Sequence, residues 1–251
     1  MLGWTRAELA RLGVRPSKKL GQNFTVNPKI IEYFLSQVPP SSLVLEIGAG
    51  LGVLTEALSS RASKVIALEK DKRLCEYLAK RFKGNEKVLI VCGDALEYPL
   101  EAEILVGSLP YSISGPFLGR VFTEGKWKKA VFLLQKEVAE RLVTEPGTKE
   151  YGRLSVMAQL CCDVELGPKW GPKSFWPPPE VESQHVVLKR KRSLPKEFSQ
   201  FLACVFSQRN KKAKKVLPRC GSSWEGEERV RELTPQHLWE AFERSRTLKG
   251  V

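Results

Sequence analysis

The 251-residue chain is predicted to fold as an α/β protein with a small C-terminal helical domain. Up to about residue 188, short apolar runs alternate with segments of helical spacing, which is typical of a doubly wound parallel sheet. One apolar run ends in a glycine-rich turn that opens a helix. Positive charge is concentrated in the last quarter, where the pattern is helical. We therefore expect an α/β domain over residues 1–188 and a basic helical domain over residues 189–251.

The first strand of the predicted sheet is Leu43–Ile47, which is apolar except for Glu46. Such a run is expected of a strand covered on both faces. Gly48, Gly50 and Gly52 follow it at alternate positions, and the next residues have helical spacing. Glycines allow a tight turn and a close approach to a ligand, which would then meet the N-terminus of a helix.

The second predicted strand, Lys64–Leu68, leads directly into an acidic residue, Glu69, at its carboxyl end. Glu69 follows Gly50 by 19 residues. Nucleotide-binding βαβ units place a carboxylate for the ribose hydroxyls at this spacing. The glycine turn and Glu69 together predict a nucleotide-like cofactor, whereas the turn alone would also fit a loop without a ligand.

Two cofactors fit this arrangement. A dinucleotide is usually bound by G-x-G-x-x-G, but this chain has G-x-G-x-G with Glu46 just before the turn. A carboxylate at that position would repel a pyrophosphate. It suits a cofactor with a cationic amino-acid end, so we favour S-adenosylmethionine over a dinucleotide.

The third strand, Lys87–Cys92, is followed by Gly93 and Asp94. The carboxyl ends of parallel strands form the edge where ligands bind in open α/β sheets. Asp94 can accept a hydrogen bond there from an adenine amine. By itself, an aspartate that caps the next helix would be the more common interpretation.

The fourth strand, Ile104–Gly107, leads into Ser108-Leu109-Pro110-Tyr111. This tetrapeptide matches the (Asp/Asn/Ser)-x-Pro-aromatic motif of methyltransferases that act on exocyclic amines. The Ser108 side chain and the Leu109 carbonyl can accept the amine protons and aim the nitrogen lone pair at a methyl donor. Tyr111 offers a flat face on which a base can stack. A proline turn with a core aromatic residue is the structural alternative.

Several sequence blocks, in order, resemble the small-subunit ribosomal RNA adenine N6,N6-dimethyltransferase family over nearly the whole chain. These blocks are KKLGQNF (18–24), LEIGAGLGVLT (45–55), VIALEKD (65–71), GDAL (93–96), SLPYSIS (108–114), LLQKEVAERL (133–142), YGRLSVMAQ (151–159), FWPPPEVES (175–183) and FSQRNKKAKKVL (206–217). The resemblance implies a Rossmann-like S-adenosylmethionine-dependent methyltransferase sheet.

The resemblance also implies roles for individual residues. It places Gln22 and Asn23 under the methionine end of the cofactor, and it places the target adenine between Tyr111 and Phe175. The residues expected to bind the cofactor are Gln22, Asn23, Thr25, Gly48, Gly50, Glu69, Lys70, Asp94, Ala95 and Ser108. Those expected to act on the target are Ser108, Leu109, Pro110, Tyr111 and Phe175.

The chain departs from the family pattern at two positions. Ser108 stands where the family usually has Asn, and a serine keeps an acceptor but lacks the reach of the amide. This change bears on the rate and on the number of methyl groups added. Glu180 stands beside the target pocket where a basic residue is usual, which bears on how flanking RNA is held.

Composition narrows the remaining possibilities. No apolar run approaches the roughly 18–20 residues of a membrane span, and the N-terminus has no signal-peptide core, so a cytoplasmic protein is expected. The protein is also expected to be a monomer. The six cysteines form no C-x-x-C pair, and His185 and His237 lie far apart in sequence, so no metal site is expected. Most of the cysteines are expected to be small core residues. The sequence shows no Ser-His-Asp or Cys-His arrangement, so hydrolytic chemistry is not expected.

Residues 189–251 carry a net charge of +9 out of the total of +13. Helical spacing over residues 198–217 predicts one amphipathic helix with an apolar face and a basic stripe. A solvated surface is the alternative, but the asymmetry of charge favours contact with phosphates. The residues expected to bind RNA are Arg209, Lys211, Lys212, Lys214 and Lys215.

These expectations define one leading function and two alternatives. The leading function is an enzyme that dimethylates N6 of two adjacent adenosines near the 3′ end of small-subunit rRNA, acting on the RNA or on a preribosomal subunit. One alternative is methylation of a large-subunit adenosine. The other is a ribosome-assembly factor that keeps the fold without catalysis, which Ser108 leaves open.

Overall fold

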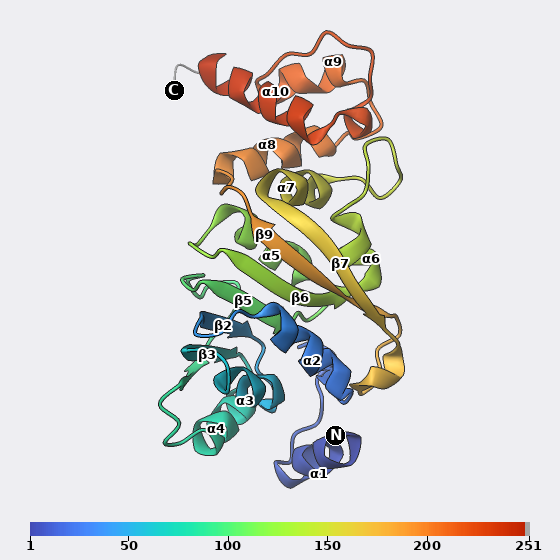
Figure 1. Cartoon of the computed structure of the whole chain (residues 1–251). Coiled ribbons are helices and arrows are strands. Elements are labelled where there is room, and N and C mark those ends of the chain that lie inside the picture. The colour runs from blue at the N-terminus through green and yellow to red at the C-terminus, as the bar shows by residue number, and fades with distance from the viewer. Residues whose placement is uncertain (249–251) are drawn as a thin grey trace. The chain divides into compact units, whose positions relative to one another are not determined.

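The computed structural model describes residues 1–248, and the side chain of Leu248 is not described. The chain forms two compact units (Figure 1). The first contains Met1–Phe117, Gly125–Ala139 and Glu165–Lys189. The second contains Leu118–Glu124, Glu140–Val164 and the chain from Arg190 onward. The functional boundary expected at residue 188 stays a prediction, and residues 249–251 of its second part lie outside the described residues.

A seven-stranded sheet has the order β4-β3-β2-β5-β6-β9-β7. The strands β2 to β6 pair in parallel, and β9 pairs antiparallel with β6. The parallel sheet that the sequence predicts is therefore a mixed one. The strands are β2 (Leu43–Ile47), β3 (Lys64–Glu69), β4 (Val88–Cys92), β5 (Ile104–Ser108), β6 (Lys129–Gln135), β7 (Cys162–Trp170) and β9 (Ser183–Arg190).

Three helices lie beside the first strands of this sheet (Figure 1). They are α2 (Pro28–Gln37), α3 (Val53–Ser59) and α4 (Lys72–Arg81). Asn27 caps α2 by accepting from the Lys29 amide, and Asp71 caps α4 by accepting from the Arg73 amide. The apolar sides of α2 and α3 form a core cluster with strand residues such as Val65 and Val106. The α/β fold predicted from the sequence is thus confirmed.

The N-terminal segment folds back onto this unit. Helix α1 (Leu2–Arg11) packs through Leu9 into a cluster that also contains Leu51 and Leu74. A short strand, β1 (Phe24–Thr25), pairs antiparallel with β8 (Phe175–Trp176). This pairing joins the KKLGQNF block to the FWPPPEVES block, about 150 residues later in the chain.

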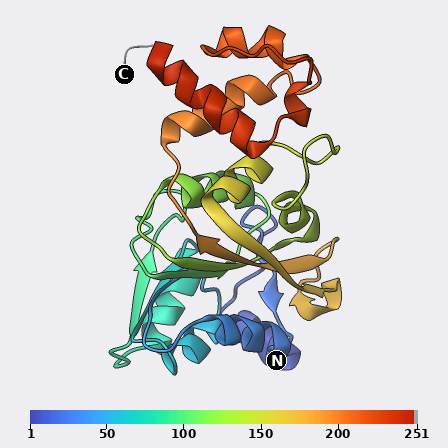
Figure 2. The same ribbon diagram turned by 45° about the horizontal axis from the view of Figure 1, so that its top comes forward.

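The second unit is mainly helical, and Figure 2 shows its orange and red C-terminal helices gathered together. The last helix of the described residues is α10 (Pro235–Leu248), which begins where the Thr234-Pro235 signal predicts. The other helices of the chain are α5 (Ser114–Thr123), α6 (Lys136–Arg141), α7 (Arg153–Cys161), α8 (Lys196–Phe206) and α9 (Ala213–Val216), with short 3₁₀ turns at Pro172–Ser174, Leu217–Cys220 and Val230–Glu232.

The single amphipathic helix predicted over residues 198–217 is wrong. Helix α8 ends at Phe206, and α9 begins only at Ala213. Between them the backbone pairs with a distant segment: the Ala213 amide donates to the Glu228 carbonyl and the Val230 amide donates to the Lys211 carbonyl. These long-range bonds take backbone groups that a continuous helix would need.

Four cysteines are paired rather than free. Cys75 and Cys92 form a disulfide between α4 and β4, and Cys204 and Cys220 form another in the second unit. Cys161 and Cys162 are free and buried, as expected of core residues. Within residues 1–248, no helix combines the length and the apolar character needed to cross a bilayer.

Candidate functional site

The turn after β2 has the left-handed backbone that the glycine pattern predicts. Gly48, Gly50 and Gly52 have φ angles of 74°, 58° and 79°. At Gly52, a Cβ would lie 2.7 Å from the ring of Phe82 and 2.8 Å from Leu78. A side chain there would be strained by the left-handed backbone and would overlap Phe82 and Leu78, which favours glycine at this N-cap of helix α3.

Glu69, at the end of β3, holds this turn in place. One carboxylate oxygen accepts from the Gly50 amide at 2.8 Å, and the other accepts from the Asp71 amide at 2.8 Å. The side chain is 7% exposed, and burial raises its pKa although the backbone donors oppose that shift. Glu69 is thus fixed at the strand edge with lone pairs left for further donors.

Asp94 occupies the corresponding place beyond β4. Its carboxylate accepts from the Leu96 amide at 2.9 Å and meets the Lys70 ammonium at 2.6 Å. Lys70 follows Glu69 directly, so the two acidic groups are linked through adjacent strand ends. Asp94 caps a turn rather than the helix that the structural alternative expected, and it also lines the cavity described below.

Glu46, the penultimate residue of β2, is the most buried carboxyl of this site. It is 2% exposed and accepts a hydrogen bond from Thr55 Oγ1 at 2.6 Å. Burial raises its pKa to about 8, the nearby Glu69 adds to the shift, and the Thr55 bond opposes it. At neutral pH the carboxyl is therefore mostly protonated in the free protein.

The segment before α2 closes one side of the same region. The Gln22 side chain donates to Asp71 Oδ2 at 3.0 Å, and it accepts from the Ser17 amide at 2.8 Å. Gly21 lies against the SLPY block, since a Cβ at Gly21 would be 2.9 Å from Pro110 Cβ. The contact brings the KKLGQNF and SLPYSIS blocks together, although they are about 90 residues apart in the chain.

The SLPY tetrapeptide leaves the end of β5 as predicted. The Leu109 amide donates to the Leu133 carbonyl at 3.0 Å, and the Leu109 side chain is buried. The hydroxyl of the partly buried Tyr111 lies 3.1 Å from Ser183 Oγ. Phe175 is 4% exposed and packs in the cluster around α2. The roles of Tyr111 and Phe175 in holding a base remain predictions.

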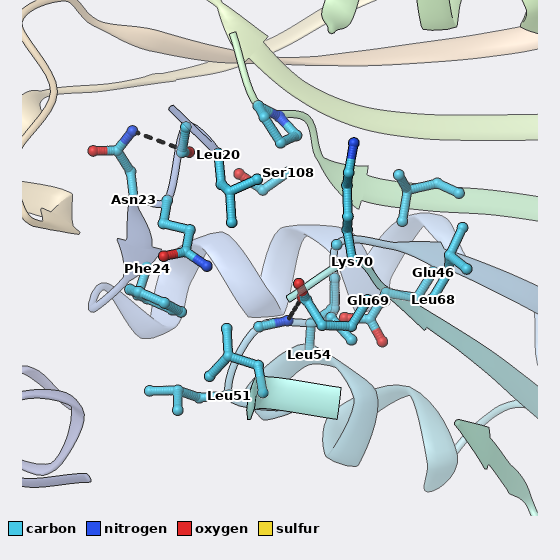
Figure 3. Close-up of a pocket in the computed structure, with 18 of the residues that line it drawn as sticks. Leu20, Asn23, Phe24, Glu46, Leu51, Leu54, Leu68, Glu69, Lys70 and Ser108 are labelled. Atoms are coloured by element: carbon cyan, nitrogen blue, oxygen red, sulfur yellow. Dashed lines mark hydrogen bonds between the residues drawn. The ribbon is translucent and has the colours of Figure 1, made fainter. Parts of the chain in front are cut away.

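All ten residues expected to bind the cofactor line one cavity in the first unit. Figure 3 shows Asn23, Glu69, Lys70 and Ser108 around it. Pro110 also lines this cavity, whereas Leu109, Tyr111 and Phe175 do not. Other lining residues were not predicted, among them Thr5 from α1 and Ile30, Ile31 and Phe34 from α2. These four lie in helices without a ligand motif, so no sequence pattern points to them.

The predicted RNA-binding residues lie in the second unit, and several already have partners there. Arg209 donates to the backbone carbonyls of Thr148 and Lys149. Lys212 and Lys214 both form ion pairs with Glu227. The remaining two, Lys211 and Lys215, are exposed. In the first unit, the unusual Glu180 is exposed too.

A family model described as ribosomal RNA adenine dimethylase matches residues 14–234. Among similar proteins is a ribosomal RNA small subunit methyltransferase A from Thermotoga maritima, 36% identical over 95% of this chain and 88% of that protein. A probable one from Pyrobaculum aerophilum is 38% identical over 90% of this chain and 97% of that protein. Another from Thermococcus kodakarensis is 43% identical over 72% of this chain, but the alignment spans only 65% of that protein.

Solved structures agree on the fold. A dimethyladenosine transferase from Plasmodium falciparum superimposes with a TM-score of 0.77 at 24% identity, covering 90% of this chain and 98% of that one. The 23S rRNA methyltransferase ErmE gives a TM-score of 0.66 at 24% identity, covering 89% and 100%. Together with the Rossmann-like sheet and the extent of the family match, these relatives show that the chain belongs to the ribosomal RNA adenine dimethylase family.

Proposed function

We propose that this protein transfers methyl groups from S-adenosylmethionine to N6 of two adjacent adenosines near the 3′ end of small-subunit rRNA. The observation that carries the proposal is one cavity that contains Glu69 and Asp94 at neighbouring strand ends and extends to Ser108 and Pro110. The relatives named as small-subunit methyltransferases support the choice of RNA.

The residues of the cavity fit S-adenosylmethionine. Glu69 is placed to accept from ribose hydroxyls, and Asp94 from the adenine amine. The hydroxyl of Thr25 lines the cavity, is buried and has no hydrogen-bond partner on the protein, as expected of a group that a ligand satisfies. When bound, the cofactor supplies an electrophilic methyl group. Glu46 offers a carboxyl near a cationic amino-acid end.

The SLPY block prepares the target nitrogen. An adenine N6 lone pair is delocalised into the ring, so the amine must be held pyramidal before it attacks. Ser108 Oγ and the Leu109 carbonyl are the acceptors proposed for the two amine protons. Tyr111 is proposed to stack on the base, with its ring fixed by the contact between its hydroxyl and Ser183.

The proposed RNA partner follows from the distribution of charge. The net charge of +9 over residues 189–251 supports an electrostatic role for the second unit on phosphates. All four lysines of the predicted set are exposed, and Lys212 and Lys214 also form ion pairs with Glu227. We take the protein to act as a monomer, in the cytoplasm, on small-subunit rRNA or a preribosomal small subunit.

The test is methyl transfer from labelled S-adenosylmethionine to immature small subunits, followed by mapping of the modified nucleotides. Dimethylation of two adjacent adenosines near the 3′ end is the expected result. Label in large-subunit RNA would replace the proposal with the large-subunit alternative. Cofactor and subunit binding without transfer would identify a non-catalytic assembly factor instead.

A further inference from the structure

Helix α1 lies entirely outside the region that the family model matches, which begins at residue 14. Its two buried residues, Thr5 and Leu9, are four positions apart and so lie on one face of the helix. Leu9 packs with Leu51 of the glycine turn and Leu74 of α4. The face that carries Thr5 is therefore turned toward the cofactor cavity.

Thr5 lines that cavity and is 1% exposed. Its hydroxyl is buried and has no hydrogen-bond partner on the protein. Thr25, which the family resemblance places against the cofactor, has the same two properties and lines the same cavity. Because buried hydroxyls are nearly always hydrogen-bonded, both need a partner that the protein does not supply.

Contacts on both sides hold α1 in this position. The Arg6 guanidinium lies 4.3 Å from the ring centroid of Trp176, on the strand β8 that also carries Phe175. The Arg81 guanidinium lies 5.2 Å from the Trp4 ring and donates to the Leu51 carbonyl. These contacts link the residues flanking Thr5 to the glycine turn and to the predicted target-base strand.

We propose that α1 completes the cofactor site and that the Thr5 hydroxyl hydrogen-bonds to the nucleoside half of bound S-adenosylmethionine. The inference rests on the proposed function. The cluster around Leu9 contains residues of β3 and α4, and β3 ends in Glu69, the proposed ribose partner. The α2 residues instead belong to a different cluster. Thr5 therefore lies on the Glu69 side of the cavity.

The test is calorimetric binding to the full-length protein of two ligands, S-adenosylhomocysteine and 5′-methylthioadenosine, which share the nucleoside half. Thr5→Val removes the hydroxyl while keeping the shape, and Thr5→Ser keeps the hydroxyl. Loss of one neutral hydrogen bond corresponds to a weakening of about threefold to tenfold. We expect Thr5→Val to weaken both ligands by that factor and Thr5→Ser to bind like the wild type.

Thr144→Val is the matched control, because its hydroxyl has protein partners, the Ser155 hydroxyl and the Arg141 carbonyl, and does not line the cavity. We expect it to lower the melting temperature and leave both affinities unchanged, whereas Thr5→Val should leave the melting temperature of the free protein unchanged or higher. This crossed pattern separates a ligand contact from a packing role.

Unchanged affinities in Thr5→Val would overturn the inference, and so would equal losses in Thr5→Val and Thr5→Ser. A loss confined to S-adenosylhomocysteine would place the contact at the methionine end and refute the assignment to the nucleoside half. Failure of the wild type to bind either ligand would reject the proposed function itself. Glu69→Ala separates failure of the α1 inference from failure of the proposed function. If Glu69→Ala abolishes ligand binding while Thr5→Val leaves ligand binding unchanged, only the α1 inference fails.

Discussion

We predict that cofactor binding is linked to the release of a proton from the Glu46 carboxyl. The carboxyl is almost fully buried and its pKa is raised to about 8, so it is mostly neutral in the free protein at pH 7. A cation placed in the cavity favours the ionised carboxylate. Binding of S-adenosylmethionine should therefore tighten as the pH rises, with nearly one proton released per cofactor at pH 7.

The magnitude follows from the fraction of Glu46 that is already ionised. With a pKa of about 8, that fraction is roughly 3% at pH 6.5 and about one half at pH 8. If the ionised form is the one that binds, the affinity should rise up to about 15-fold across this interval. S-adenosylhomocysteine lacks the sulfonium charge and should show a smaller rise.

Isothermal titration calorimetry in buffers of different ionisation enthalpy measures both the affinity and the number of protons released. Glu46→Gln should bind with an affinity independent of pH over this range and release no proton. Glu243→Gln, an exposed position in α10, serves as the control and should behave like the wild type. A wild-type affinity independent of pH, with no proton released, would refute the linkage.

Stability gives an independent check with a defined sign. The raised pKa means that the folded state binds more protons than the unfolded state between roughly pH 4.5 and 8. The free energy of unfolding should therefore decrease as the pH rises through this window, by a few kcal/mol in total. Glu46→Gln should lose that decrease, so its stability relative to the wild type should improve most above pH 8.

Four further predictions test the site, the basic segment and a disulfide. Glu69→Ala should weaken cofactor binding roughly tenfold or more by calorimetry, since a buried hydrogen-bonded acceptor is worth about 1–3 kcal/mol; unchanged affinity in a folded protein would contradict the ribose assignment. Tyr111→Ala should impair methyl transfer while sparing cofactor affinity, and a loss of affinity instead would indicate a structural role. Neutralising the four lysines of residues 211–215 should weaken binding to the small subunit and flatten the slope of log affinity against log salt concentration by up to about 2–4 units. Glu227→Gln is the control for the ion pairs that this change breaks. An unaltered slope would remove this segment from the RNA surface. Replacing Cys75 and Cys92 together by Ala should lower the free energy of unfolding by about 3 kcal/mol in denaturant titrations, given the 17-residue separation. Equal stability of this variant and the wild type would argue against the bond.

Two of the strands that carry the site, β2 and β5, could be predicted from the sequence because they are buried. The predicted Leu43–Ile47 matches β2 at both ends, and the predicted Ile104–Gly107 differs from β5 by one residue. Parallel strands covered on both faces are continuous apolar runs, which stand out against any neighbouring pattern. The largely exposed β7 has polar residues and a proline along it. Because it contains no continuous apolar run, it was not predicted from the sequence.

Features that depend on distant partners could not be predicted. The break between α8 and α9 arises because Lys212 bridges to Arg229 and neighbouring backbone groups pair with the same segment. Local spacing favoured a continuous helix there. Similarly, the cavity-lining role of Thr5 depends on how α1 folds back, which no motif records.

Three carboxyl groups at neighbouring strand ends of this sheet have three different environments. Glu46 is buried against a single hydroxyl, so its charge responds to what enters the cavity. Both oxygens of Glu69 accept from backbone amides, so this carboxylate shapes the glycine turn, and it is the proposed partner of the ribose. Asp94 is less buried and forms an ion pair with Lys70, beside the proposed position of the adenine. The sequence predicts acidic residues at all three places, but the division of roles among them follows from burial and hydrogen bonding, which only the fold determines.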